Sequence, residues 1–283
     1  MKYEIEDITN KVFLGDCRTV LKEFPDDAVQ ACITSPPYWN CRDYKNESQM
    51  GMEVSIEGYI NELADVMDEV KRVLRPDGSL WINIGDCWTG NNIIRSDGRR
   101  GFIKSKKIIN VKRDIEGLSN GNRVGVPWRV AFELQKRGWI LRLEIIWAKP
   151  NPMPEPPMNR PTVAHEYVFL LAKTSKYFYN ADAVKEKANE GSKYETRNKN
   201  SVWKVRSASF KGAHIATFPQ ELIIPMVLAG TPESLSSIVL DPFMGSGTTA
   251  IVAKRLGRSY TGVELSKEYL KIINNRLSQQ ELF

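Results

Sequence analysis

Apolar and polar positions divide the chain into short apolar segments and longer amphipathic ones. An apolar run from Ala28 to Thr34 predicts a buried strand, which ends abruptly at Ser35-Pro36-Pro37. Residues 56–74 carry apolar side chains at helical spacing and stop at the breaker Arg75-Pro-Asp-Gly78. The same criteria predict strands at 80–84, 140–148, 166–172, 238–240 and 260–263, and helices at 127–137, 220–229, 248–256 and 267–277. Strands that alternate with helices predict an α/β fold with a mainly parallel, doubly wound sheet.

Three segments interrupt this alternation. Residues 88–125 are rich in glycine, asparagine, lysine and arginine without a clear period, which predicts a long mobile loop. Six prolines between 149 and 161 predict an extended, rigid connection. Residues 185–211 are polar and basic, with aromatic residues among them. We therefore expect one domain over 1–283, with a basic loop insertion at 88–125 and a short target-recognition segment at 185–211.

The positive charge of the chain is concentrated in two of these segments. The net charge is +6, yet residues 95–113 hold eight lysines and arginines against one acidic residue, and residues 185–211 hold eight against three. Two basic segments suit a polyanion such as nucleic acid, and two solvated loops are the alternative. No apolar run is long enough to suggest a membrane span, and the polar start predicts a cytoplasmic protein. The four cysteines form no CxxC pair, so reduced thiols are expected rather than a metal or disulfide site.

A glycine-rich turn is the candidate cofactor site. Gly245 and Gly247 lie between an apolar strand and a helix, where they permit a tight turn and a close approach of the backbone to a ligand. The absence of a lysine after the second glycine disfavours a phosphate-binding P-loop. Glu264 follows Gly245 by 19 residues and ends the next predicted strand, where an acid accepts hydrogen bonds from ribose hydroxyls. Together these features predict a nucleoside cofactor, although a glycine turn also serves packing alone.

The segment from Thr34 to Trp39 is the candidate catalytic site. Consecutive prolines fix the backbone and donate no N–H, which leaves carbonyl oxygens as acceptors. The Ser35 side chain and the Pro36 carbonyl would hold the hydrogens of a substrate amine in the tetrahedral geometry of the transition state. Tyr38 would offer a flat face to a base turned out of the duplex. A proline-rich turn with core aromatic residues is the alternative.

The two motifs together resemble the S-adenosylmethionine-dependent amino-methyltransferases. In that family an (Asp/Asn/Ser)-Pro-Pro-(Tyr/Phe) motif follows a strand and a Phe-x-Gly-x-Gly turn binds the cofactor. Here Ser35-Pro-Pro-Tyr38 precedes Phe243-Met-Gly-Ser-Gly247, the permuted order that resembles the beta group of DNA methyltransferases. The resemblance extends to Gly15-Asp16, to His214–Pro219 and to Trp147–Pro152 followed by His165-Glu166. It implies a circularly permuted, Rossmann-like class I methyltransferase with an antiparallel hairpin, basic insertions and S-adenosyl-L-methionine as cofactor.

The resemblance also assigns roles to individual residues. Ser35, Pro36, Pro37 and Tyr38 would form the base pocket. Residues that would contact the cofactor are Asp16, Phe218, Asp241, Phe243, Gly245, Gly247, Thr248 and Glu264. The Ser-Pro-Pro-Tyr form is typical of members that act on N4 of cytosine, whereas Asp-Pro-Pro-Tyr is typical of adenine N6; adenine or RNA stays the alternative acceptor. Carbon-5 methylation is disfavoured because the chain has no Pro-Cys nucleophile.

Double-stranded DNA is the expected substrate. Side chains expected to steer or contact it are Arg99, Arg100, Lys104, Lys106, Lys107, Arg197, Trp203, Lys204 and Arg206. His165 and Trp39 are interpreted as packing residues or as neighbours of the pocket. A cognate restriction endonuclease and a homodimer are compatible with the resemblance. A catalytically inactive nucleic-acid-binding module is a further alternative, against which the two intact motifs argue.

Overall fold

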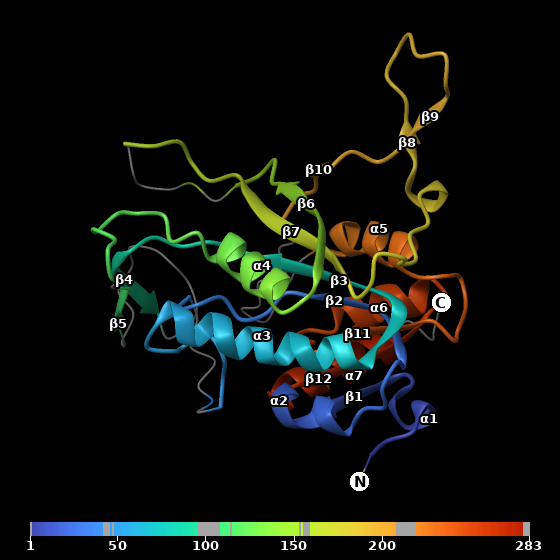
Figure 1. The fold of residues 1–283 in the computed structure, drawn as a ribbon, viewed down its shortest axis with the longest axis horizontal. Coiled ribbons are helices and arrows are strands. Elements are labelled where there is room, and N and C mark those ends of the chain that lie inside the picture. Colours follow the sequence, from blue (N-terminus) through green and yellow to red (C-terminus); the bar gives the residue numbers. More distant parts are fainter. Residues whose placement is uncertain are drawn as a thin grey trace.

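A single mixed sheet organises the molecule (Figure 1). A computed structural model of the chain describes residues 2–41, 46, 48–95, 108–113, 115–152, 154, 159–207 and 219–279. Within these ranges the main sheet has eight strands, which are β1 (Lys11–Leu14), β2 (Val29–Thr34), β3 (Leu74–Ile84), β6 (Ile140–Ala148), β7 (His165–Ala172), β10 (Val202–Lys204), β11 (Ile238–Asp241) and β12 (Ser259–Glu264). Their order is β1-β12-β11-β2-β3-β7-β6-β10, and β7 runs antiparallel to both of its neighbours.

Helices cover both faces of this sheet. One face packs against α1 (Ile5–Ile8), α2 (Cys17–Val20), α3 (Ile56–Val73) and α4 (Val126–Lys136), together with the 3-10 helix η1 (Leu21–Glu23). The other face packs against α5 (Gln220–Gly230), α6 (Thr248–Arg255) and α7 (Lys267–Gln279), with the 3-10 helix η2 (Asp182–Val184) beside α5. In the described ranges no helix is long and apolar enough to cross a membrane. The mainly parallel, doubly wound sheet predicted from the sequence is therefore confirmed.

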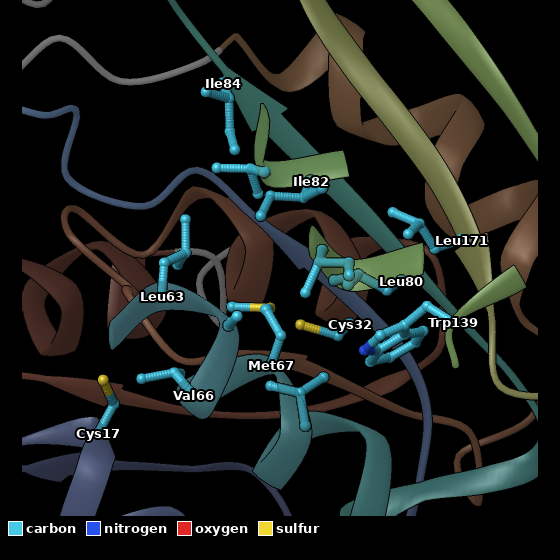
Figure 2. Packing of buried hydrophobic residues seen from close by; sticks show 14 of the residues in the cluster. Cys17, Cys32, Leu63, Val66, Met67, Leu80, Ile82, Ile84, Trp139 and Leu171 are labelled. Atoms are coloured by element: carbon cyan, nitrogen blue, oxygen red, sulfur yellow. The ribbon is translucent and has the colours of Figure 1, made fainter. Parts of the chain in front are cut away.

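The alternation of side chains along β3 explains why the sheet has two cores. Leu80, Ile82 and Ile84 face α3 and join Cys32 and Met67 in the first core (Figure 2). The intervening Trp81 faces the opposite side and joins the second core. Strands covered on both faces need apolar residues at every position, which is why the central strands appear in the sequence as short continuous apolar runs.

Five parts of the structure differ from the sequence-based expectations. The predicted loop at 88–125 is wrong for β4 (Gly90–Arg95) and β5 (Ile108–Arg113), which pair as an antiparallel hairpin. Main-chain hydrogen bonds form such a ladder without a periodic apolar pattern. The short strands β1 and β10, and the hairpin of β8 (Glu186–Lys187) with β9 (Thr196–Arg197), were not predicted either. Strand β3 begins at Leu74, directly after α3 ends.

Candidate functional site

The motif residues meet at the carboxyl edge of the parallel strands. Asp16 follows β1, Ser35 follows β2, Gly85 follows β3, and Asp241 and Glu264 end β11 and β12. Because these five strands are parallel neighbours, the residues that follow them lie along one edge. The connections leaving β11 and β2 also pass to opposite faces of the sheet, through α6 and α3. Such a switch point is where open α/β sheets bind their ligands.

The glycine turn is held in place by the strand beside it. Gly245 and Gly247 adopt left-handed backbone conformations, with φ of 56° and 80°. Glu264 accepts a hydrogen bond from the Gly245 N–H at 2.7 Å and, through its other carboxylate oxygen, one from the Ser266 N–H at 2.7 Å. From α7, the Arg276 guanidinium donates to the Ser246 hydroxyl at 2.9 Å. The turn thus joins α6 with its backbone fixed on two sides.

Glu264 fits the acceptor role expected for ribose hydroxyls. Its carboxyl is mostly buried, and burial raises its pKa from the ordinary 4.5 to about 7. Each carboxylate oxygen accepts one backbone hydrogen bond and retains a lone pair for a second donor. An acidic acceptor beside a glycine turn is the arrangement that suits the ribose hydroxyls of a nucleoside.

Asp241 joins the glycine turn to the strand that leads into the double-proline corner. Its buried carboxylate accepts hydrogen bonds from the Thr34 hydroxyl at 2.7 Å and the Phe243 N–H at 3.0 Å through one oxygen, and from the Thr249 hydroxyl at 2.7 Å through the other. Burial raises the pKa of Asp241 to about 6, against the lowering effect of these three hydrogen bonds. Both oxygens are therefore occupied by the protein, so the geometry supports a bridging role between the end of β2 and the turn.

The other expected cofactor residues lie around the same edge. Asp16 caps α2 and pairs with Arg18 at 2.6 Å. Thr248 is buried at the start of α6, 3.3 Å from the Ser246 hydroxyl, and Phe243 is half-buried against the first core. Phe218 lies outside the described residues. A cofactor contact by each of these side chains stays a prediction.

The double-proline corner presents acceptors at the end of β2. The Pro37 carbonyl is occupied, because it accepts a hydrogen bond from the Tyr59 hydroxyl at 2.9 Å. The Pro36 carbonyl accepts from no donor among the described residues. The Ser35 hydroxyl lies 3.4 Å from both the Tyr38 hydroxyl and the Asn83 amide oxygen. The corner therefore offers the Ser35 oxygen and the Pro36 carbonyl as acceptors, and their contact with an amine stays a prediction.

Tyr38 is fixed on several sides. Its hydroxyl donates to Glu166 at 2.8 Å and lies 3.1 Å from the Asn83 amide oxygen. A Cβ added to Gly85 would lie 2.6 Å from Tyr38 Cε2, so Gly85 permits the backbone to approach the ring. Burial, together with the negative charge of Glu166, raises the pKa of Tyr38 well above its ordinary value. Tyr38 is therefore a neutral phenol whose ring position is set by its neighbours.

The residues predicted to bind DNA are placed differently from one another. Lys204 ends β10 and Arg206 follows it, both exposed, and Arg197 lies on the β8–β9 hairpin, 3.0 Å from Glu186. The Trp203 side chain is a core residue rather than an exposed one, since it is 6% exposed and lies in the second core. The expected residues of the first basic segment, Arg99, Arg100, Lys104, Lys106 and Lys107, lie outside the described residues.

Two groups of residues at this edge were missed by the sequence analysis. Asn83 and Gly85 contact the double-proline corner and belonged to no motif noted in the sequence, whereas Lys149 and its partner Glu166 lie in two noted segments without an assigned role. The second group is a stack in which the guanidiniums of Arg123 and Arg160 lie over the Trp88 ring, at 4.2 and 3.9 Å from its centroid. Neither group has a short-range sequence signal, because its members come from separate segments.

The packing residues of the motif region can also be placed. Trp39 is buried and its indole N–H donates to the Glu53 carbonyl at 2.9 Å, which makes it a packing residue rather than part of a pocket rim. His165 is half-buried at the start of β7, with its ring edge-on to Tyr167.

Comparison with known proteins agrees with this geometry. The DNA methylase family (N6_N4_Mtase) matches residues 29–275. The type II methyltransferase M.Cfr9I of Citrobacter freundii is 44% identical over 272 residues, which cover 95% of this chain and 88% of that protein. The type II methyltransferase M.SmaI of Serratia marcescens is 40% identical over 270 residues, covering 94% of this chain and 90% of that protein.

Solved structures share the fold. PvuII DNA methyltransferase (cytosine-N4-specific) matches with a TM-score of 0.69 and 20% identity, over 95% of this chain and 86% of that one. A DNA modification methylase of Thermus thermophilus, in complex with S-adenosyl-L-methionine, matches with a TM-score of 0.65 and 25% identity, over 96% of this chain and 94% of that one. The permuted, Rossmann-like methyltransferase fold predicted from the sequence is confirmed.

Proposed function

This chain belongs to the DNA methylase family, the beta-group S-adenosylmethionine-dependent DNA amino-methyltransferases, and we propose that its acceptor atom is N4 of cytosine. The observation that carries the proposal is the Ser35-Pro-Pro-Tyr38 corner, hydrogen-bonded through Thr34 and Asp241 to the cofactor turn. The name of the PvuII neighbour, which states cytosine-N4 specificity, agrees with it.

The corner supplies what an exocyclic amine needs in order to react. The nitrogen lone pair is delocalised into the ring, and the amine must become tetrahedral before that lone pair is available. Acceptors at Ser35 Oγ and the Pro36 carbonyl would bind its two hydrogens in that geometry, which favours the transition state over the ground state. When bound, S-adenosylmethionine supplies an electrophilic methyl group. Glu264 and the glycine turn would orient that cofactor beside the corner.

A flipped base would lie against Tyr38. Amines paired inside a duplex are not accessible, so the target must leave the stack. The Tyr38 ring is held by Gly85 and by its hydroxyl partners, which leaves the phenol as a fixed surface for a base. Its raised pKa keeps it neutral, so we assign it stacking and positioning rather than proton transfer.

Duplex DNA would contact the cationic side chains near this edge. In the Arg123–Trp88–Arg160 stack, Trp88 follows β3, Arg123 precedes α4 and Arg160 precedes β7. Lys204 and Arg206, at the carboxyl end of β10, would add further phosphate contacts, whereas the β8–β9 hairpin projects from the other end of that strand (Figure 1). By analogy with relatives named type II methyltransferases, we also propose that methylation protects the DNA from a restriction endonuclease.

Nucleoside analysis tests the proposed acceptor. Duplex DNA of mixed sequence, incubated with the protein and labelled S-adenosylmethionine, is digested to nucleosides and analysed by mass spectrometry. The expected product is N4-methylcytosine alone. N6-methyladenine as the product would overturn the choice of base, and an unmethylated digest despite cofactor binding would support an inactive binding module.

A further inference from the structure

A line of hydrogen-bonded side chains runs from Ser35 away from the cofactor turn and ends at an ion pair. The Ser35 hydroxyl lies 3.4 Å from the Tyr38 hydroxyl, which lies 2.8 Å from a carboxylate oxygen of Glu166. The other Glu166 oxygen is paired with the Lys149 ammonium. These side chains come from the β2 corner, the start of β7 and the end of β6, so three segments of the chain meet in this line.

The chemistry of the groups sets the direction of each hydrogen. An ammonium only donates and an ionised carboxylate only accepts, so Glu166 paired with Lys149 accepts the single Tyr38 hydrogen. The Tyr38 oxygen is then an acceptor toward Ser35. The Asn83 amide nitrogen donates to the Tyr167 carbonyl at 3.0 Å, which turns its amide oxygen toward the same corner as a second acceptor.

The direction matters because Ser35 has one hydrogen and two lone pairs. Both neighbours that the structure gives its hydroxyl, Tyr38 and the Asn83 oxygen, are acceptors. The Ser35 hydrogen therefore points toward them, and its lone pairs are left for other donors. An incoming amine is such a donor.

We propose that Glu166 is a positioning residue that acts through Tyr38 to keep the Ser35 hydroxyl as a hydrogen-bond acceptor for the substrate amine. The inference rests on the proposed function, since it assigns a role in the same site. Half-burial of both partners supports it, because the Glu166 and Lys149 side chains are 20% and 18% exposed and are therefore only weakly screened by solvent.

Glu166→Gln is the informative substitution. Glutamine has the same shape but one oxygen and one NH2 group. Lys149 must take the oxygen, so the NH2 group would face Tyr38 and make the tyrosine oxygen an acceptor. The Tyr38 hydrogen would then turn toward Asn83 or Ser35, and Ser35 would lose its fixed direction. The change also weakens the ion pair with Lys149, so a purely structural Glu166 would lower stability and leave kcat unchanged, whereas a positioning Glu166 would lower kcat.

A double-mutant cycle tests the proposal. We expect Glu166→Gln to lower kcat about tenfold, with the DNA KM and the cofactor Kd within about twofold of wild type. In the Tyr38→Phe background, which lacks the hydroxyl, Glu166→Gln should have no further effect. Glu144→Gln, at an exposed position on the adjacent β6, is the matched control and should leave kcat unchanged.

Each outcome decides between the alternatives. A Glu166→Gln protein with wild-type kcat would overturn the proposal, as would an equal loss in the wild-type and Tyr38→Phe backgrounds, since Glu166 would then act elsewhere. Cofactor binding by each variant reports an intact glycine turn and separates a local effect from misfolding. A wild-type protein that methylates no DNA would instead refute the proposed function.

Discussion

Replacement of Asp241 by alanine or asparagine tests how the two motifs are held together. The alanine variant removes the acceptor for the Thr34 hydroxyl, the Phe243 N–H and the Thr249 hydroxyl. Thr249 retains the Ile33 carbonyl, 3.3 Å away, as a second acceptor. Two donors would therefore be left unpaired in a buried site.

The cost of the alanine variant follows from these two donors. A buried donor without a partner costs about 1–3 kcal/mol, so Asp241→Ala should lower the free energy of unfolding by about 2–6 kcal/mol. A domain is typically stable by only about 5–15 kcal/mol, so this loss is large. The displaced turn should also bind the cofactor more weakly.

The asparagine variant should behave differently, because its amide satisfies every partner. The amide oxygen replaces the carboxylate oxygen that accepts from Thr34 and Phe243. The NH2 group replaces the other oxygen and donates to Thr249, whose own hydrogen turns to the Ile33 carbonyl. Asparagine also avoids a buried charge. We expect Asp241→Asn to stay within about 1 kcal/mol of wild type at pH 7.

Urea unfolding at pH 7, followed by circular dichroism and tryptophan fluorescence, measures both variants under the same conditions. Isothermal calorimetry with S-adenosylmethionine then reports the state of the glycine turn. Equal destabilisation by asparagine and alanine would refute the hydrogen-bond argument, because only the alanine variant leaves donors unpaired. An alanine variant as stable as wild type would refute it as well.

Three further predictions concern neighbouring parts of the edge. Gly85→Ala places a methyl carbon 2.6 Å from Tyr38 Cε2, so stability should fall by about 1–3 kcal/mol and kcat should fall with cofactor Kd unchanged. The pKa of Glu264 is raised from 4.5 to about 7, so the folded protein binds this proton more tightly than the unfolded chain does. The resulting stability is fully present below about pH 4.5 and is lost as the pH rises to about 7, by up to about 3 kcal/mol. Glu264→Gln should remove this pH dependence from the unfolding curves. Arg160→Ala should weaken DNA binding and reduce the slope of log K against log salt by about one, and Arg123→Ala should reduce it by less, because Asp86 lies 2.6 Å from the Arg123 Nε.

The results that would contradict these predictions are specific. Wild-type kcat in Gly85→Ala would mean that the Tyr38 ring position does not matter for turnover. The pH prediction would be contradicted if the wild-type protein became more stable between pH 5 and 7 by the amount expected for Glu264 and this gain were lost in Glu264→Gln. An unchanged salt slope in both arginine variants would place DNA elsewhere on the surface.

Patterns within single segments were sufficient to predict the fold. The apolar run that became β2 and the helical spacing that became α3 each carry a local signal, and their alternation gave the doubly wound sheet. The strands β1 and β10 were missed because few of their side chains are buried, whereas the equally short β11 is buried at every position and forms an apolar run. The hairpin β4–β5 was missed because main-chain pairing leaves little trace in the sequence.

The candidate site could be predicted where its residues were adjacent in sequence. Ser35 to Tyr38 and the glycine turn are continuous motifs, and the structure brings them to one edge. The partners of Tyr38 could not be predicted, since Asn83 and Glu166 are 45 and 128 residues away and meet it only after folding. The hydrogen bond between Asp241 and Thr34 could not be predicted from the sequence either, because the two residues are 207 positions apart.

The rate of single-turnover methyl transfer by Ser35→Ala tests most directly whether the double-proline corner acts on the substrate amine. The protein is first bound to DNA, in excess over the DNA, and labelled cofactor is then added, so that the measured rate is that of the chemical step. Calorimetry gives the cofactor Kd. Loss of the Ser35 acceptor should slow transfer on the order of a hundredfold while the Kd changes less than about twofold. Transfer at the wild-type rate would contradict the claim that the double-proline corner and the glycine turn form one methyl-transfer site.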